Sequence, residues 1–167
     1  MISTRPALAD DALAVFEGYV ATARTPGLLV SQPEEIALAA VQADIAGCTG
    51  EGGCFLVATR GGQVVGHACL ARMGLRAVRH IYRLTSVVHP GHTGQGVGRQ
   101  LLQALHAWAE ANPQCRKIEL LVRAGNAPAV RLYEAMGYRH EGRLAQRVQD
   151  AGGVMHDDLA MAFFFPR

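Results

Sequence analysis

Apolar residues spaced three or four apart predict four helices along the chain. The first helix follows Asp10 or Asp11, either of which can act as its N-cap. Its predicted inner face is Leu13, Phe16 and Val20. A capping box at residues 31–34 predicts the start of the second helix. The predicted inner face of that helix is Leu38, Val41 and Ile45.

The third and fourth helices lie in the second half of the chain. The third has a predicted apolar face of Val97, Leu101, Ala104, Leu105 and Trp108. Pro113 is expected to stop it. Asn126 is expected to cap the fourth helix, and Gly137 to end it.

Runs rich in branched residues predict the strands. A short strand opens the chain, and two runs around the Gly61-Gly62 pair predict a hairpin. Further strands are expected at about residues 78–88 and 117–122, followed by two runs flanking residues 150–153. The predicted order is β-α-α-β-β-β-α-β-α-β-β. It favours one α+β domain over residues 1–167, built on a mixed sheet.

Composition excludes several classes of protein. Half of the 167 residues are hydrophobic and the formal net charge is +2, with no run of Lys or Arg to suggest a nucleic-acid partner. No apolar stretch approaches the roughly 20 residues that cross a bilayer. The N-terminus has no signal-peptide pattern, and the four cysteines form no C-x-x-C pair. We therefore expect a cytoplasmic protein with reduced thiols and no membrane or nucleic-acid partner.

The stretch "VVHPGHTGQGVGRQLLQAL" is where the sequence first indicates a ligand. Glycines at positions 94, 96 and 98 stand directly before a helix, although glycine costs roughly 1 kcal/mol of helix propensity relative to alanine. A strand, a glycine loop and a helix N-terminus together suit an anion such as a phosphate. A tight turn without a ligand would explain the glycines alone equally well. Val97 stands where a Walker A lysine is required, and the dinucleotide fingerprint lacks its last glycine.

Two motifs in order give a more specific reading. Val88, Pro90, Thr93 and the three glycines fit V-x-P-x-x-[R/Q]-G-x-G-x-G, apart from Thr93. This resembles the coenzyme A pyrophosphate loop of the GNAT superfamily of acyl-CoA-dependent N-acetyltransferases. The downstream stretch "GNAPAVRLYEAMGYRHEG" resembles the second motif of that family, and the element order resembles the family too. The resemblance implies a mostly antiparallel sheet flanked by helices, with a V-shaped splay between the fourth and fifth strands.

The resemblance also implies a cofactor site and a catalytic acid. Acetyl-CoA is the expected co-substrate, with no metal. The residues implied to contact it are Val87, Val88, Thr93, Gly94, Gln95, Gly96, Val97, Gly98, Arg99 and Asn126. Thr93 replaces the usual Arg or Gln, which puts one pyrophosphate contact in question but leaves the backbone cradle. Tyr133 matches the tyrosine that protonates the departing thiolate, although its helical stripe alone would make it a core aromatic residue.

The sequence alone does not identify the general base or the acceptor. The strand before the loop carries no Asp or Glu. The candidate bases elsewhere are Glu17, Glu35, His80, His89, Asp157 and Asp158, with a water chain as an alternative. The resemblance places the acceptor between residues 22–35 and the last hairpin. Arg143 and Arg147 there could bind a carboxylate.

Three functions follow, in order of preference. The first is N-acetylation of a primary amine of a small molecule or amino acid, and the second is acetylation of protein N-termini or lysines. The third is a non-catalytic acyl-CoA-binding module, which the intact Tyr133 and Asn126 disfavour. A homodimer is expected by resemblance only. His89 and His92 form a lone His-x-x-His without further ligands, a weak metal signal.

Overall fold

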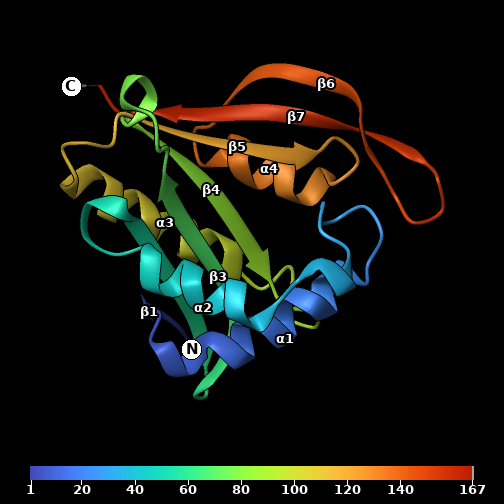
Figure 1. The fold of residues 1–167 in the computed structure, drawn as a ribbon, viewed down its shortest axis with the longest axis horizontal. Helices are drawn as coiled ribbons and strands as arrows, with labels where there is room; N and C mark the ends of the chain where they lie inside the picture. Colours follow the sequence, from blue (N-terminus) through green and yellow to red (C-terminus); the bar gives the residue numbers. More distant parts are fainter. Residues whose placement is uncertain (167) are drawn as a thin grey trace.

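One seven-stranded sheet, in the order β1-β2-β3-β4-β5-β7-β6, forms the centre of the computed structural model, which describes residues 1–166 (Figure 1). The strands are β1 (Ile2–Pro6), β2 (Gly53–Arg60), β3 (Gln63–Arg72), β4 (Ile81–Val88), β5 (Lys117–Arg123), β6 (Arg139–Gln149) and β7 (Met155–Phe164). All neighbouring strands pair antiparallel except β4 and β5, which are parallel. The predicted mixed α+β fold is confirmed.

Helices cover both faces of the sheet. They are α1 (Ala12–Ala23), α2 (Leu38–Gly47), α3 (Val97–Ala111) and α4 (Ala127–Ala135). Residues of α3 and α4 share the larger core with the inner faces of the strands, for example Leu101 and Leu105 with Leu70 and Ile118. Helices α1 and α2 build a smaller core on the other face around Val15, Val41 and Val57.

The inner face of α1 differs from the predicted one. Leu13 is 55% exposed, and the residues that face inward are Ala12, Val15, Gly18 and Thr22. These are mostly small side chains, so the helix lies close to the sheet. Of the predicted face, Phe16 is partly buried and packs against the smaller core, whereas Leu13 turns outward. An apolar-period pattern gives weight to leucine and therefore missed a face made of small residues.

The capping box predicted at residues 31–34 is displaced by one residue. Glu35 accepts a hydrogen bond from the backbone N–H of Gln32 at 2.7 Å, and this box opens a short 3-10 turn at Pro33–Glu35. Helix α2 begins only at Leu38, without a side-chain cap. Its predicted inner residues Val41 and Ile45 are buried.

Gly18 gives α1 room for a buried histidine. The ring of His89, which follows β4, lies where a Gly18 Cβ would be only 2.2 Å away. His89 Nε2 lies 3.1 Å from Nδ1 of His67 on β3, and both side chains are buried. His67 in turn contacts the ring of Tyr19, with ring centroids 5.5 Å apart. The start of the glycine loop is thereby fixed against α1.

Replacing Gly18 should therefore destabilise the fold strongly. We expect Gly18→Ala to lower the free energy of unfolding by about 1–3 kcal/mol, since a buried ring must move to admit the methyl group. Gly47→Ala is the matched control, because Gly47 is also helical and an added Cβ there meets nothing within 4 Å. It should be neutral or stabilising by up to about 1 kcal/mol. Urea denaturation of both variants measures the difference. Equal stabilities would contradict the close packing of the His89 ring against Gly18.

The histidine pair should also make stability fall in acid. Burial lowers the pKa of His67 to about 3, helped by His89, and burial lowers the pKa of His89 as well. Between about pH 3 and pH 6.5 the unfolded chain binds protons that the folded chain does not, so the free energy of unfolding falls as the pH falls. Urea titrations at pH 7, 6, 5 and 4 should show this slope, and His67→Met should flatten it. His140→Gln, at an exposed histidine, should keep the wild-type slope.

Candidate functional site

The parallel strands β4 and β5 separate soon after they begin. They pair only over Ile81–Arg83 with Lys117–Glu119, and beyond these residues they diverge, as Figure 1 shows. A cleft of about 230 Å³ opens where they part. Its strand walls are Leu84, Thr85 and Ser86 of β4 and Leu121, Val122 and Arg123 of β5. The V-shaped splay between the fourth and fifth strands is confirmed.

Helix α4 forms a further wall of the cleft. Asn126 caps this helix by accepting a hydrogen bond from the N–H of Ala129 at 3.4 Å, and both residues line the cleft. Tyr133 lies one turn further along and also lines it. Its side chain is buried, and burial raises the pKa of its hydroxyl to about 12, so the group keeps its proton at neutral pH. Within residues 1–166 the hydroxyl makes no hydrogen bond, which leaves it able to donate.

The glycine loop leads from β4 into α3 in left-handed turns. Gly94 and Gly96 have φ of 70° and 84°, where a side chain is strained, and an added Cβ at either would meet nothing within 4 Å. Gly96 is the N-cap of α3 and provides no side-chain cap, and the first turn carries no acid. The first N–H groups of the helix are thus left for an anion.

The other predicted loop residues have varied surroundings. A Cβ on Gly98 would lie 3.0 Å from Leu132, so this glycine allows α3 and α4 to approach closely. Val97 is buried in the core, and Thr93 is exposed. Gln95 donates to the carbonyl of Gly91 at 2.9 Å and accepts from Arg60 at the end of β2.

Arg99 and the two valines that end β4 complete the predicted set. Arg99 is exposed, with Nη1 4.0 Å from the sulfur of Met136. Val87 is buried and pairs with His67 of β3, whereas Val88 is half-buried and pairs with Gly66. The backbone of both valines continues the cleft wall of β4 toward the loop.

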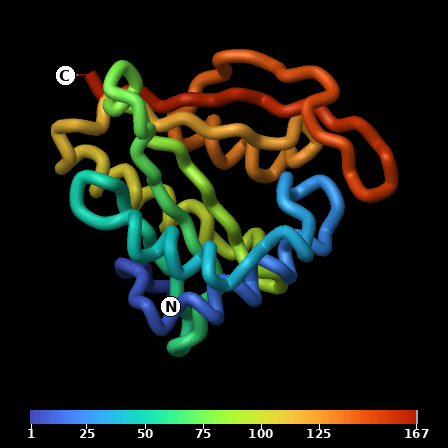
Figure 2. The backbone as a smooth tube through the Cα atoms, viewed as in Figure 1, coloured from blue at the N-terminus to red at the C-terminus, as the bar shows by residue number. Residues whose placement is uncertain are grey.

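A second cavity, of about 490 Å³, adjoins the cleft and is called here the outer cavity. It lies between the loop after α1 and the turn that joins β6 to β7, two segments that Figure 2 shows side by side. Leu29 and Arg123 line both the cleft and the outer cavity. The outer cavity occupies the region that the resemblance assigns to the acceptor.

A buried ion pair lies where the two cavities meet. Arg123 of β5 and Asp158 of β7 are register partners, and their side chains are 7% and 4% exposed. Arg123 Nη1 contacts Asp158 Oδ1 in an ion pair, whereas Arg123 Nε makes no hydrogen bond with any residue from 1 to 166. Burial, with a smaller contribution from the nearby Arg147, lowers the pKa of Arg123.

The structure separates the six candidate bases. Of these, Asp158 alone lines the cleft within the described chain. Glu35 is held in its capping box, and Asp157 accepts from Arg143 at 2.6 Å and from the N–H of Gln146 at 2.8 Å. His89 is paired with His67. Neither Glu17 nor His80 lines the cleft or the outer cavity.

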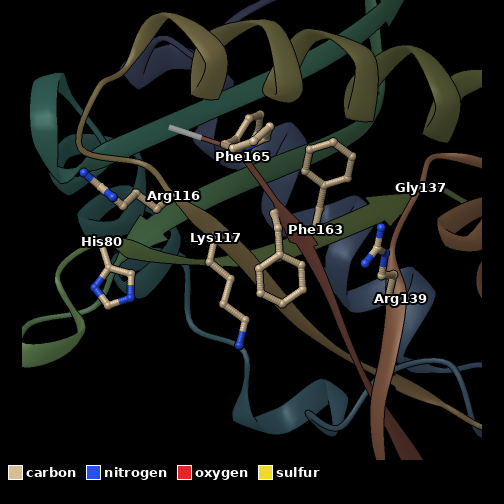
Figure 3. A pocket seen from close by; sticks show the side chains of 9 residues that line it. His80, Arg116, Lys117, Gly137, Arg139, Phe163 and Phe165 are labelled. Carbon is tan, nitrogen blue, oxygen red and sulfur yellow. The ribbon is translucent and has the colours of Figure 1, made fainter.

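A cavity of about 620 Å³, larger than the cleft and the outer cavity, lies at the opposite end of β5 (Figure 3). It is lined by His80, Arg116, Lys117, Gly137, Arg139, Phe163, Phe164, Phe165 and Pro166. It shares no residue with the cleft or the outer cavity, so we place the chemistry in the smaller cleft. Among residues 1–166 no group of three or more His, Cys, Asp or Glu is arranged to hold a metal, and no helix there has the length and apolarity of a membrane span.

The fold and the site define an acetyltransferase of the GNAT type. The acetyltransferase (GNAT) family model matches residues 21–138, and the chain belongs to this family. The structure of yncA, a putative acetyltransferase from Salmonella typhimurium with its cofactor acetyl-CoA, superposes with a TM-score of 0.92 at 21% identity over 100% of this chain and 95% of that one.

Two further relatives carry N-acetyltransferase names. A ribosomal-protein-alanine N-acetyltransferase from Brucella melitensis superposes with a TM-score of 0.89 at 26% identity, over 98% of this chain and 99% of that one. N-alpha-acetyltransferase RimI of Mycobacterium tuberculosis is 33% identical over 89 residues. This match spans 53% of each chain, so it covers about half the length of that relative.

Sequence reasoning missed three residues of the site. Tyr19 of α1 lines the cleft, Arg60 binds Gln95 of the glycine loop, and Arg123 joins the two cavities. Each is brought into place by strand register or helix packing over a long range. Arg123 directly follows the predicted strand at 117–122, and a charged residue at the end of a strand is the one local signal that was available.

Proposed function

We propose that the protein transfers an acetyl group from acetyl-CoA to the primary amine of a small molecule or amino acid. The observation that carries the proposal is the Tyr133 hydroxyl. It is buried and protonated, and it lies in the same cleft as the unpaired side of β4 and the N-terminus of α4. A proton donor beside a split parallel pair suits a thioester whose sulfur must leave as a thiol.

The residues of the glycine loop fit the pyrophosphate of the cofactor. The start of α3 has no side-chain cap and no acid, and the loop is open above Gly94 and Gly96. The backbone N–H groups of residues 94–99 would hold the pyrophosphate, with Arg60 beside them on the Gln95 side. Bound acetyl-CoA supplies an electrophilic thioester carbonyl.

The chain's own groups divide the chemistry between them. Backbone groups near Val87 and Val88 would bind the pantetheine arm, and a backbone N–H there would polarise the carbonyl. Tyr133 would donate its proton to the sulfur as the carbon–sulfur bond breaks, because a free thiol has a pKa of about 8.5 and leaves more readily when protonated. Asn126, besides capping α4, would contact the cofactor arm.

The lining of the cleft favours an acceptor that carries a carboxylate. Arg147 lines the cleft and has no ion-pair partner within residues 1–166, whereas Arg143 is taken by Asp157. Leu28, Leu29 and Val30 give the cleft an apolar wall. A free arginine beside an apolar wall suits an amino acid with an apolar side chain.

Acetylation of a protein N-terminus is a second candidate. It is favoured by the names of the Mycobacterium tuberculosis and Brucella melitensis relatives, whose identities to this chain are 33% and 26%. The four cysteines form no disulfide within residues 1–166, which supports a reducing, cytoplasmic location for either function. A thiol-release assay with acetyl-CoA and a panel of amines, amino acids and peptides tests both. If no acceptor is acetylated, the result would favour the non-catalytic acyl-CoA-binding module instead.

The cofactor loop can be tested at Gly96. We expect Gly96→Asp to weaken acetyl-CoA binding at least a hundredfold, because a carboxylate would project into the space proposed for the pyrophosphate. Gly50→Asp is the control, with a φ of 56° and open surroundings just before β2, at the strand end opposite to Arg60. Calorimetry with acetyl-CoA should give wild-type affinity for the control. Unchanged affinity in a folded Gly96→Asp protein would contradict this cofactor site.

The acid can be tested at Tyr133. Tyr133→Phe keeps the ring and removes the proton, so kcat should fall roughly 10²-fold with little change in acetyl-CoA affinity. Tyr138→Phe is the control, since this neighbouring buried tyrosine bonds His106 at 3.0 Å and lies outside the cleft. The Tyr138→Phe protein should lose about 1 kcal/mol of stability and keep the wild-type kcat. Rapid-quench kinetics measure the chemical step; wild-type rates in Tyr133→Phe would return Tyr133 to a packing role.

A further inference from the structure

We propose that Asp158, held in place by Arg123, binds the amine of the acceptor and receives its proton. The assignment rests on the proposed acetyl transfer and adds to it the group that orients the nucleophile. It is drawn from the place of the Arg123–Asp158 pair at the junction of the cleft and the outer cavity.

The pair leaves one carboxylate oxygen for a ligand. Both side chains are more than nine-tenths buried, and Arg123 Nη1 contacts Asp158 Oδ1 in an ion pair. Removing two charges from water is costly, so further hydrogen bonds to the pair stabilise it. A carboxylate has two acceptor oxygens, so an N–H donor in the cleft would bond to the other one, Oδ2, and an amine is such a donor.

The location of Asp158 matches the path that the acceptor must take. Arg123 lines both cavities, and Asp158 lines the cleft together with Tyr133 and Asn126. A nucleophile that enters from the outer cavity therefore passes this carboxylate before it meets the thioester. Asp158 is the one acid among the residues that line the cleft; Glu34 and Asp150 line only the outer cavity.

The step balances without any further reactant. The neutral amine forms a bond to the acetyl carbon while the carbonyl electron pair moves to oxygen. The electron pair on oxygen then re-forms the carbonyl as the carbon–sulfur bond breaks, and the sulfur leaves with the electrons of that bond and takes the proton of Tyr133. The nitrogen gives one proton to Asp158, which passes it to solvent, and Tyr133 regains a proton from solvent. Arg123 remains charged throughout and keeps the carboxylate in position.

The test compares an acceptor with its analogue that lacks the amine. The best acceptor of the panel and its deamino analogue (for leucine, 4-methylpentanoate) are titrated by calorimetry in the presence of coenzyme A. Wild type should bind the amine at least tenfold more tightly than the analogue. Asp158→Asn should remove this preference and lower kcat/KM for the acceptor at least a hundredfold, with acetyl-CoA affinity unchanged. A general distortion would weaken both ligands equally and keep the preference.

Two further variants complete the design. Asp157→Asn is the control, because it also removes a carboxylate paired with an arginine but lies outside the cleft; it should keep the preference for the amine. If Asp158→Asn fails to fold with a lone buried arginine, Arg123→Met combined with Asp158→Asn removes both charges, and the preference should be lost there too.

The possible failures can be told apart. Wild-type protein that acetylates no amine would overturn the proposed function, and with it this assignment. Wild-type turnover with an unchanged amine preference in Asp158→Asn, or in the double variant, would overturn the assignment alone.

Discussion

The separation of β4 from β5 after three paired positions is the constraint on which the site depends. Each strand keeps its antiparallel neighbour along its length, β4 with β3 and β5 with β7, so the division costs backbone hydrogen bonds on one side only. The groups exposed there need partners, because buried backbone N–H and C=O groups are rarely left unpaired. An extended ligand with amide groups supplies them, and it would then lie between Tyr133 and the glycine loop.

The pair formed by Arg123 and Asp158 is a consequence of the same division. Beyond the last β4–β5 pair, β5 has its hydrogen-bonded neighbour only in β7, so the end of β5 forms the floor of an opening that two cavities share. A neutral apolar pair at these register positions would avoid the desolvation of two charges, and such replacements are often as stable as the ion pair or more so. If Asp158 binds the acceptor amine as proposed, the stability lost to these charges would be offset by a preorganised acceptor site.

The sequence predicted the elements well because each has a strong local period or a specific turn. The four helices, the Gly61-Gly62 hairpin and the Asn126 cap are confirmed. Local patterns failed where packing decided the outcome. The small inner face of α1 depends on the His89 ring beneath Gly18. The position of Asp158 in the cleft, which the other five candidate bases do not share, depends on the register between β5 and β7. Neither fact has a signature within a window of ten residues.

The two halves of the site are fixed to each other through α1. Tyr19 lines the cleft and touches His67, which is in hydrogen-bond contact with His89 at the entrance to the glycine loop. The close approach at Gly18 restricts movement of His89 relative to α1, which would keep the proposed cofactor loop and acceptor wall at a constant separation. Transfer between two bound substrates requires the reacting atoms to be held about 3–3.5 Å apart, and errors near 1 Å can cost about 10²-fold in rate. A small helix face packed around an uncharged histidine pair is therefore a physical means of keeping the nucleophile and the thioester in register.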